Sequence, residues 1–190
     1  IYHVGTIACV KQVLRLPGGN VRLLVEGKSR AVLRAVTQEE PYFVGALDEV
    51  LEQGTPVSIE TDALLRTAHH YFEEYCKMSG RISGETMQSV LEIEDPGQLA
   101  DIIAANVLSK IEDRQQVLEE FDELARLESV CALLVRETEL AGVEKKVQAR
   151  VRKQIEQNQK DYFLREQIKA IQTELGDKDA TDVEDLRERL

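Results

Sequence analysis

Few residues of this chain have the types and the spacing that catalysis or ligand binding requires. Gly27-Lys28-Ser29 resembles the end of a phosphate-binding loop, in which backbone N–H groups surround the phosphates and the lysine reaches them. Such a loop needs a glycine five residues before its Gly-Lys pair, and Arg22 occupies that position. Because strand-like residues lie on both sides, the sequence predicts an ordinary turn at Gly27-Lys28-Ser29.

A metal site is the second possibility, because His69, His70 and Cys76 lie on one predicted helix. Adjacent side chains point about 100° apart on a helix, so His69 and Cys76 supply at most two ligands on one face. His3 has no serine and aspartate around it in a recognisable triad order. We therefore expect no catalytic, cofactor-binding or metal-binding residue in this chain, and we expect these side chains to pack in the core or lie on the surface.

The composition is that of a folded domain. The chain has 190 residues, of which 43 % are hydrophobic, so one or two domains with a proper core are possible. We find no apolar run as long as a membrane span and no signal-peptide pattern. Three widely spaced cysteines, Cys9, Cys76 and Cys131, argue against a disulfide framework. We expect a cytoplasmic protein that does not associate with membranes.

Charge is distributed unevenly along the chain, whose net charge is −11. Residues 61–144 contain 18 acidic and seven basic residues, which disfavours non-specific nucleic-acid binding by the whole chain. Residues 145–176 are the exception, with eight basic and four acidic residues. This stretch fits a solvated helix face, and it also fits a contact for an acidic partner or a nucleic-acid backbone, to which 145–160 would bind weakly.

Residues 1–60 have the pattern of β-strands. Two apolar stretches flank Pro17-Gly18-Gly19-Asn20, which predicts a hairpin with a Gly-rich loop. Val21, Leu23 and Val25 alternate with polar residues as they would in a half-buried strand. Further strands fit 30–36 and 42–50, giving a meander of four or five strands. Because a β-module of this size is marginal alone, we expect it to be incomplete, with more strands upstream.

Helices follow the strands. Apolar residues at helical spacing predict helices over 62–78, over 83–93, from Pro96 through Leu108, and over 114–127. Asp95 is expected to cap its helix, with Pro96 at the first position. Short connections between these segments favour an antiparallel bundle over 61–128.

One long helix is expected over 129–176, since Gly142 is the only glycine or proline between Gly97 and Gly176. About 48 residues at roughly 1.5 Å each would reach about 70 Å. Leu140, Val143, Val147, Val151 and Ile155 form one apolar stripe, and Leu164, Ile168, Ile171 and Leu175 form a second. The polar stretch between them favours a bridge between packed regions over an ordinary bundle helix. Residues 177–190 fit the beginning of a linker.

Three stretches in this order resemble the N-terminal region of the Lon family of ATP-dependent proteases. They are VGTIACVKQVLRLPGGNVRLLVEG (4–27), IEDPGQLADIIAANV (93–107) and QKDYFLREQIKAIQTELGD (159–177). The resemblance implies an α+β fold with an N-terminal PUA-like β-module, a helical bundle and a long helix leading to an AAA+ module and a serine protease domain. It also implies that ATP, Mg²⁺ and a Ser-Lys dyad belong to those later domains, which this sequence lacks, and that the intact protein is a hexamer.

We therefore expect a non-catalytic region that recognises unfolded, misfolded or regulatory protein substrates and contributes to assembly. Candidate contact residues are apolar side chains beside the hairpin loop and after the polar part of the long helix, namely Leu14, Leu16, Leu24, Tyr162, Phe163 and Leu164. The three leucines also fit contact with upstream strands. Two alternatives stay open, a coiled-coil scaffold whose long helix forms a dimer and a nucleic-acid-binding arm.

Overall fold

The computed structural model describes residues 1–51, 54–56 and 58–188, with side chains described through Glu174. The chain divides into two compact units, Ile1–Ala141 and Gly142–Leu190. The first unit holds a β-sheet and a bundle of helices, and the second consists of the continuation of the last helix.

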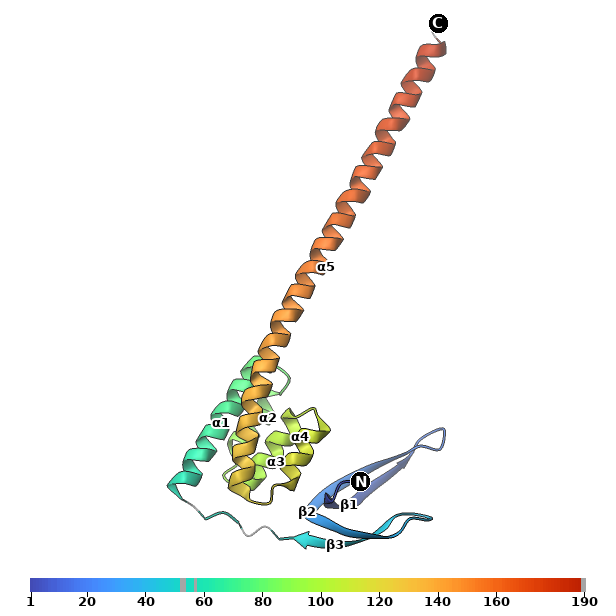
Figure 1. Cartoon of the computed structure of the whole chain (residues 1–190). Helices are drawn as coiled ribbons and strands as arrows, with labels where there is room; N and C mark the ends of the chain where they lie inside the picture. The colour runs from blue at the N-terminus through green and yellow to red at the C-terminus, as the bar shows by residue number, and fades with distance from the viewer. Residues whose placement is uncertain (52–53, 57, 189–190) are drawn as a thin grey trace. The chain divides into compact units, whose positions relative to one another are not determined.

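The sheet has three antiparallel strands in the order β1-β2-β3 (Figure 1). They are β1 (Val4–Arg15), β2 (Val21–Gln38) and β3 (Val44–Val50). The predicted hairpin is confirmed, because β1 and β2 pair along their lengths and the backbone turns between them at Gly18 and Gly19. Both glycines have positive φ angles, of 86° and 80°, which side chains with a Cβ rarely adopt.

The expected number of strands is wrong for the described residues, since the segments predicted at 21–27 and 30–36 form the single strand β2. Gly27-Lys28-Ser29 lies inside this strand and is not a turn. Ala8 pairs with Gly27 and Ile7 pairs with Ser29, so Lys28 is the extra residue of a β-bulge. The apolar pattern is irregular at these residues, which had suggested a break between two strands. The irregularity marks the bulge, and β2 continues on both sides of it.

Most of the described helices begin where a short polar side chain accepts a hydrogen bond from a free N–H group of the first turn. Helix α1 (Ile59–Ser79) follows Ser58, and α2 (Gly84–Leu91) follows Ser83. Helix α3 (Pro96–Val107) has the predicted cap, because the Asp95 carboxylate accepts a hydrogen bond of 2.6 Å from the Gln98 N–H and Pro96 occupies the first turn. Gly80 ends α1 with a φ of 63°, in the left-handed region.

The last two helices have different bounds from those predicted. Helix α4 (Ile111–Glu119) is shorter than the expected 114–127 segment, and α5 (Glu123–Glu188) begins six residues before the predicted start at 129. Asp122 explains the early start, because its side chain accepts a 2.9 Å hydrogen bond from the Ala125 N–H as an N-cap does. Helix α5 also continues beyond Gly176 through the segment predicted to start a linker.

The buried core lies within the helices of the first unit. Phe72 of α1, Leu99 and Ile103 of α3, and Leu127 and Leu134 of α5 are among its fully buried side chains. Because the first turns of α5 are apolar on one side, they pack in one buried cluster with the apolar faces of α1 to α4. The predicted α+β class, with a β-rich module, a helical bundle and one long helix, is confirmed.

Candidate functional site

One face of the β1–β2 hairpin carries a group of exposed apolar side chains, which we call the hairpin patch. Directly opposed pairs Val10–Val25 and Val13–Leu23, with Val21 beside them, make up the patch. Each of the five side chains is 52 to 56 % exposed. A contiguous group of this kind is typical of a surface that binds another molecule.

A second β-bulge explains why this patch is not visible in the sequence. Val10 pairs with Val25 and Gln12 with Leu24, so Lys11 is an extra residue in β1. Since side chains alternate along a strand, Val10 and Val13 would point to opposite faces of a regular strand. The bulge brings them to the same face. The prediction that Val21, Leu23 and Val25 form a half-buried face is wrong for the described structure, where all three are mainly exposed.

The predicted contact residues of the β-module lie near this patch. Leu14 opposes Arg22 and Leu24 opposes Gln12, which places both leucines on the other face of the same hairpin. Leu16 follows β1, and its N–H donates to the Asn20 carbonyl at 2.8 Å. All three leucines are exposed. Their contact with a substrate stays a prediction.

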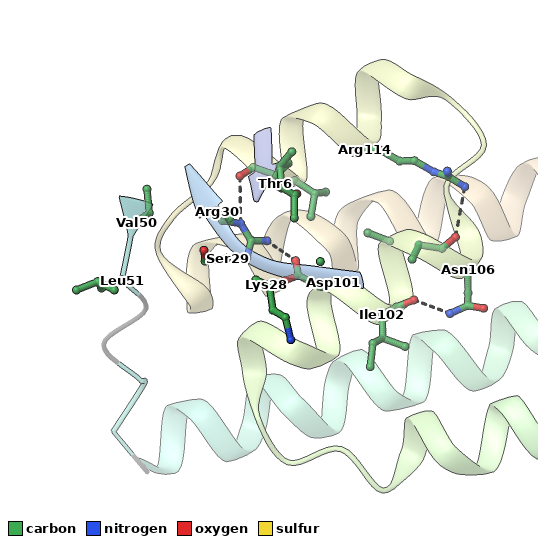
Figure 2. A pocket seen from close by; sticks show the side chains of 15 residues that line it. Thr6, Lys28, Ser29, Arg30, Val50, Leu51, Asp101, Ile102, Asn106 and Arg114 are labelled. Atoms are coloured by element: carbon green, nitrogen blue, oxygen red, sulfur yellow. Dashed lines mark hydrogen bonds and ion pairs between the residues drawn. The ribbon is translucent and has the colours of Figure 1, made fainter. Parts of the chain in front are cut away.

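A groove of about 980 Å³ lies between the sheet and the helices α3 and α4 (Figure 2). Its apolar wall includes Ile102, Val117 and Leu118. Its polar wall includes Arg30 of β2 and Asp101 of α3, which form an ion pair. Two further basic residues line the groove, Lys28, which pairs with Glu26, and Arg114, which donates to the Leu108 carbonyl at 2.6 Å. The groove therefore combines an apolar surface with basic groups that already have partners.

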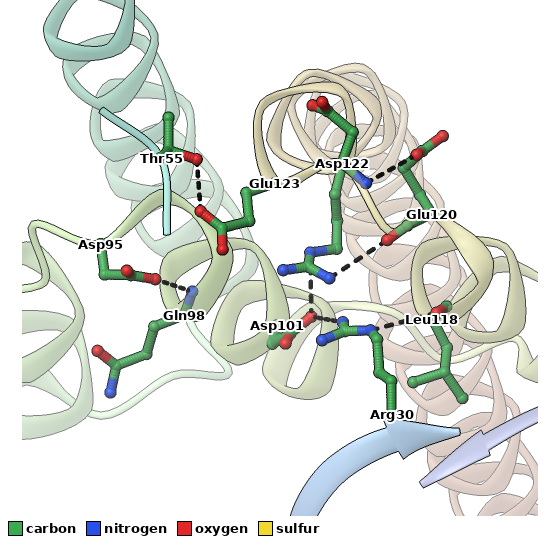
Figure 3. Close-up of polar contacts among 10 residues, drawn as sticks. Arg30, Thr55, Asp95, Gln98, Asp101, Leu118, Glu120, Asp122 and Glu123 are labelled. Carbon is green, nitrogen blue, oxygen red and sulfur yellow. Dashed lines mark hydrogen bonds and ion pairs between the residues drawn. The ribbon is translucent and has the colours of Figure 1, made fainter. Parts of the chain in front are cut away.

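Two arginines share the Asp101 carboxylate beside this groove, and we call Arg30, Asp101 and Arg126 the arginine–aspartate junction. Figure 3 shows the contact between Arg30 and Asp101. Arg30 donates from Nη2 to Asp101 Oδ1 and from Nε to the Leu118 carbonyl at 3.2 Å. Arg126 Nε lies 3.6 Å from the same Asp101 oxygen. Arg126 is completely buried and Arg30 is 8 % exposed. Sequence reasoning missed this cluster, because its members come from β2, α3 and α5.

The residues considered for metal binding are separated by the fold. His70 is exposed and lies 3.7 Å from Glu74, whereas His69 points into the bundle and Cys76 is part of the core. Burial lowers the pKa of His69 and raises that of the Cys76 thiol. Burial also raises the pKa of Cys131 to about 11, so this thiol stays protonated and unreactive near neutral pH. Among the described residues, no group of three or more potential ligands could hold a metal ion.

The second unit presents apolar side chains along α5, and we call Val143, Val147, Val151 and Ile155 the helix stripe. They recur every four residues and are about half exposed. Tyr162, Phe163 and Leu164 follow on the same helix, are exposed, and point in successive directions about 100° apart. Their role as contact residues stays a prediction. In the part of the chain that the structure describes, every helix is too short or too polar to span a membrane.

Comparison with known proteins identifies the family. Residues 1–136 match the ATP-dependent protease La (LON) substrate-binding domain. The Lon protease of Brevibacillus choshinensis is 45 % identical over 192 residues, covering all of this chain and 24 % of the relative. The Lon protease of Syntrophomonas wolfei gives the same identity and coverage. This chain thus spans about a quarter of the length of the curated relatives it matches.

A solved structure gives the same result for the fold. The N-terminal domain of the Mycobacterium avium complex Lon protease superposes with a TM-score of 0.56 at 27 % sequence identity, over 72 % of this chain and 70 % of that one. By its sequence and by its fold, the chain belongs to the family of Lon substrate-binding domains.

Proposed function

We propose that this chain captures apolar segments of unfolded, misfolded or regulatory proteins for a Lon-type ATP-dependent serine protease. The intact protein would bind ATP and Mg²⁺ in its other domains and act in the cytoplasm as a homohexamer. The observation that carries the proposal is the hairpin patch, five apolar side chains that a folded hairpin holds on one face. The family match supports a role in substrate binding.

The chemistry of the patch fits such a role. Unfolded polypeptides expose apolar side chains without a fixed sequence, and burial of apolar area gains about 25 cal/mol per Å² without directional requirements. Valine and leucine on a strand have little rotamer freedom to lose when a segment covers them. The site would therefore accept many sequences with weak affinity, as a protease that clears diverse unfolded proteins requires.

The test compares two pairs of substitutions on the hairpin. Val13→Ser with Leu23→Ser removes the centre of the hairpin patch, and Leu14→Ser with Leu24→Ser alters the opposite face. We expect the first pair to weaken binding of fluorescently labelled casein at least about tenfold, which corresponds to about 1.4 kcal/mol. Anisotropy titrations measure this effect.

Ile111→Ser is the matched control, because Ile111 is an exposed apolar residue at the start of α4, outside the hairpin. Its casein affinity should equal that of the parent chain. Equal affinity for the parent and for the Val13→Ser/Leu23→Ser chain would refute the hairpin patch as the binding surface. A loss confined to Leu14→Ser/Leu24→Ser would move the site to the opposite face.

Self-association through α5 is the second candidate, favoured by the helix stripe. Four apolar residues at spacings of four, with basic and acidic side chains around them, are suited to pack against a second helix. We expect this chain to form dimers through the stripe, and Val147→Glu with Val151→Glu to make it monomeric in sedimentation velocity. Ala149→Glu with Gln157→Glu adds the same charge outside the stripe and should leave the dimer intact. A dimer that survives the first pair would exclude the stripe as its interface.

A further inference from the structure

The sheet is attached to the helical bundle mainly by polar contacts. All residues of the main buried cluster come from the helices and their connections, and Ala31 is the only buried apolar side chain among the described residues of the sheet. Hydrogen bonds and an ion pair cross the boundary. Gln115 of α4 donates to the Val4 carbonyl at 3.0 Å, and Arg30 of β2 binds the Leu118 carbonyl and Asp101.

Polar attachment has a mechanical consequence. Hydrogen bonds exchange with water at a small net cost, whereas separation of a packed apolar core exposes its whole surface at once. A sheet held in this way can shift relative to the helices without unfolding them. The position of the sheet then depends on a few polar side chains, and Arg30 is the most buried of those that the sheet supplies.

Asp101 connects this attachment to the beginning of α5. The oxygen that accepts from Arg30 also lies next to Arg126, in the first turns of α5. Arg126 in turn donates from Nη1 to the Glu120 carbonyl at 3.2 Å, in the turn between α4 and α5. The Nη2 of Arg126 also packs closely against the α3 backbone at Gly97, where an added Cβ would lie 2.6 Å away. The position of Arg126 is thus fixed on several sides.

A second contact converges on the same place. Glu123, the first residue of α5, is buried and accepts a hydrogen bond from the Thr55 hydroxyl, in the segment that connects the sheet to α1 (Figure 3). The start of α5 therefore contacts two segments whose placement depends on the sheet, β2 through Asp101 and the connecting segment through Thr55. A displacement of the sheet changes the partners of both Arg126 and Glu123.

We propose that the arginine–aspartate junction is a conformational relay, through which the position of the sheet controls the stability of the first turns of α5. Asp101 is a positioning residue in this device, because it acts on α5 through Arg126. The groove between the sheet and the helices is lined by Arg30 and Asp101, so a segment that entered it would act directly on the junction. That last step, the response to a bound polypeptide, rests on the function proposed above.

Amide hydrogen exchange of the 190-residue chain without any ligand tests the relay itself. Arg30→Met keeps the length of the side chain and removes its charge and its donors. We expect exchange of the amides of residues 127–134, in α5, to become at least tenfold faster, although the substitution lies in β2. Asp101→Asn should have the same effect on these amides.

Arg34→Met is the matched control, because Arg34 lies on the same strand and pairs with Asp48 of β3 within the sheet. It should leave the α5 amides unchanged. If Arg30→Met changed only the sheet amides, or if Arg34→Met accelerated α5 equally, the relay would be refuted. If Asp101→Asn prevents folding, the exchange of the α5 amides in Arg30→Met is sufficient to support or refute the relay.

A second arm adds casein to the parent chain and to Arg30→Met. In the parent chain we expect changes in both β2 and residues 127–134, and in Arg30→Met a change in the sheet alone. Casein binding that changed the α5 amides equally in both chains would overturn the relay. A lack of any casein binding would refute the proposed function only, since the ligand-free comparison still tests the relay.

Discussion

Phe72→Ala is expected to destabilise the helical bundle by about 3–5 kcal/mol, the cost of removing a large aromatic side chain from a closed core. Phe72 of α1 is completely buried, and it packs in the cluster that joins α1 to α3 and the first turns of α5. Domains of this size have stabilities of about 5–15 kcal/mol, so the loss is a large part of the total. The helical signal in urea denaturation measures it.

Phe43→Ala is the matched control, since the same atoms are removed from a side chain that is 66 % exposed. We expect a change below about 0.5 kcal/mol, as for other surface substitutions. The contrast between two phenylalanines tests whether the stabilising core lies in the helices, with the sheet outside it. If both substitutions cost the same, the sheet would contribute to a core that the burial pattern does not show.

The starts of α2 and α3 could be predicted from the sequence, because their signals are local. A serine or aspartate that binds the N–H group three residues later works through neighbouring atoms, and Asp95-Pro96 illustrates this in both the sequence and the structure. The start of α5 was missed although Asp122 gives the same signal. The apolar pattern continues across the turn at 120–122. For this reason the sequence predicted one helix over 114–127, although Asp122 can cap a new helix.

The candidate surfaces were less predictable, for two physical reasons. The hairpin patch depends on the bulge at Lys11, which changes the face of every later residue in β1, and a bulge leaves no clear mark in an apolar pattern. The arginine–aspartate junction depends on contacts between residues 30, 101 and 126. A single sequence contains no information on which of its many charged residues meet, so the complete burial of Arg126 had no local signal.

Gly97→Ala tests the packing around that buried arginine, and the expected sign is opposite to the usual one. Alanine in place of glycine within a helix normally stabilises it by up to about 1 kcal/mol. At Gly97 the new Cβ would lie 2.6 Å from Arg126 Nη2 and 3.1 Å from Glu123 Cγ. Because Arg126 is buried and held by Asp101 and the Glu120 carbonyl, its guanidinium cannot move away freely. We expect a net loss of about 2–3 kcal/mol in the free energy of unfolding.

Gly84→Ala provides the matched comparison, since Gly84 lies in the first turn of α2 and no atom outside its neighbours would come within 4 Å of the new Cβ. That substitution should leave the stability unchanged or raise it slightly, in the same urea titrations. The difference between the two alanines isolates the contact with Arg126 from the change in backbone entropy, which both share. Equal effects at both positions would mean that the Arg126 guanidinium moves away from the added methyl group at little cost. A guanidinium that moves so easily could not transmit a change in the position of the sheet to the start of α5.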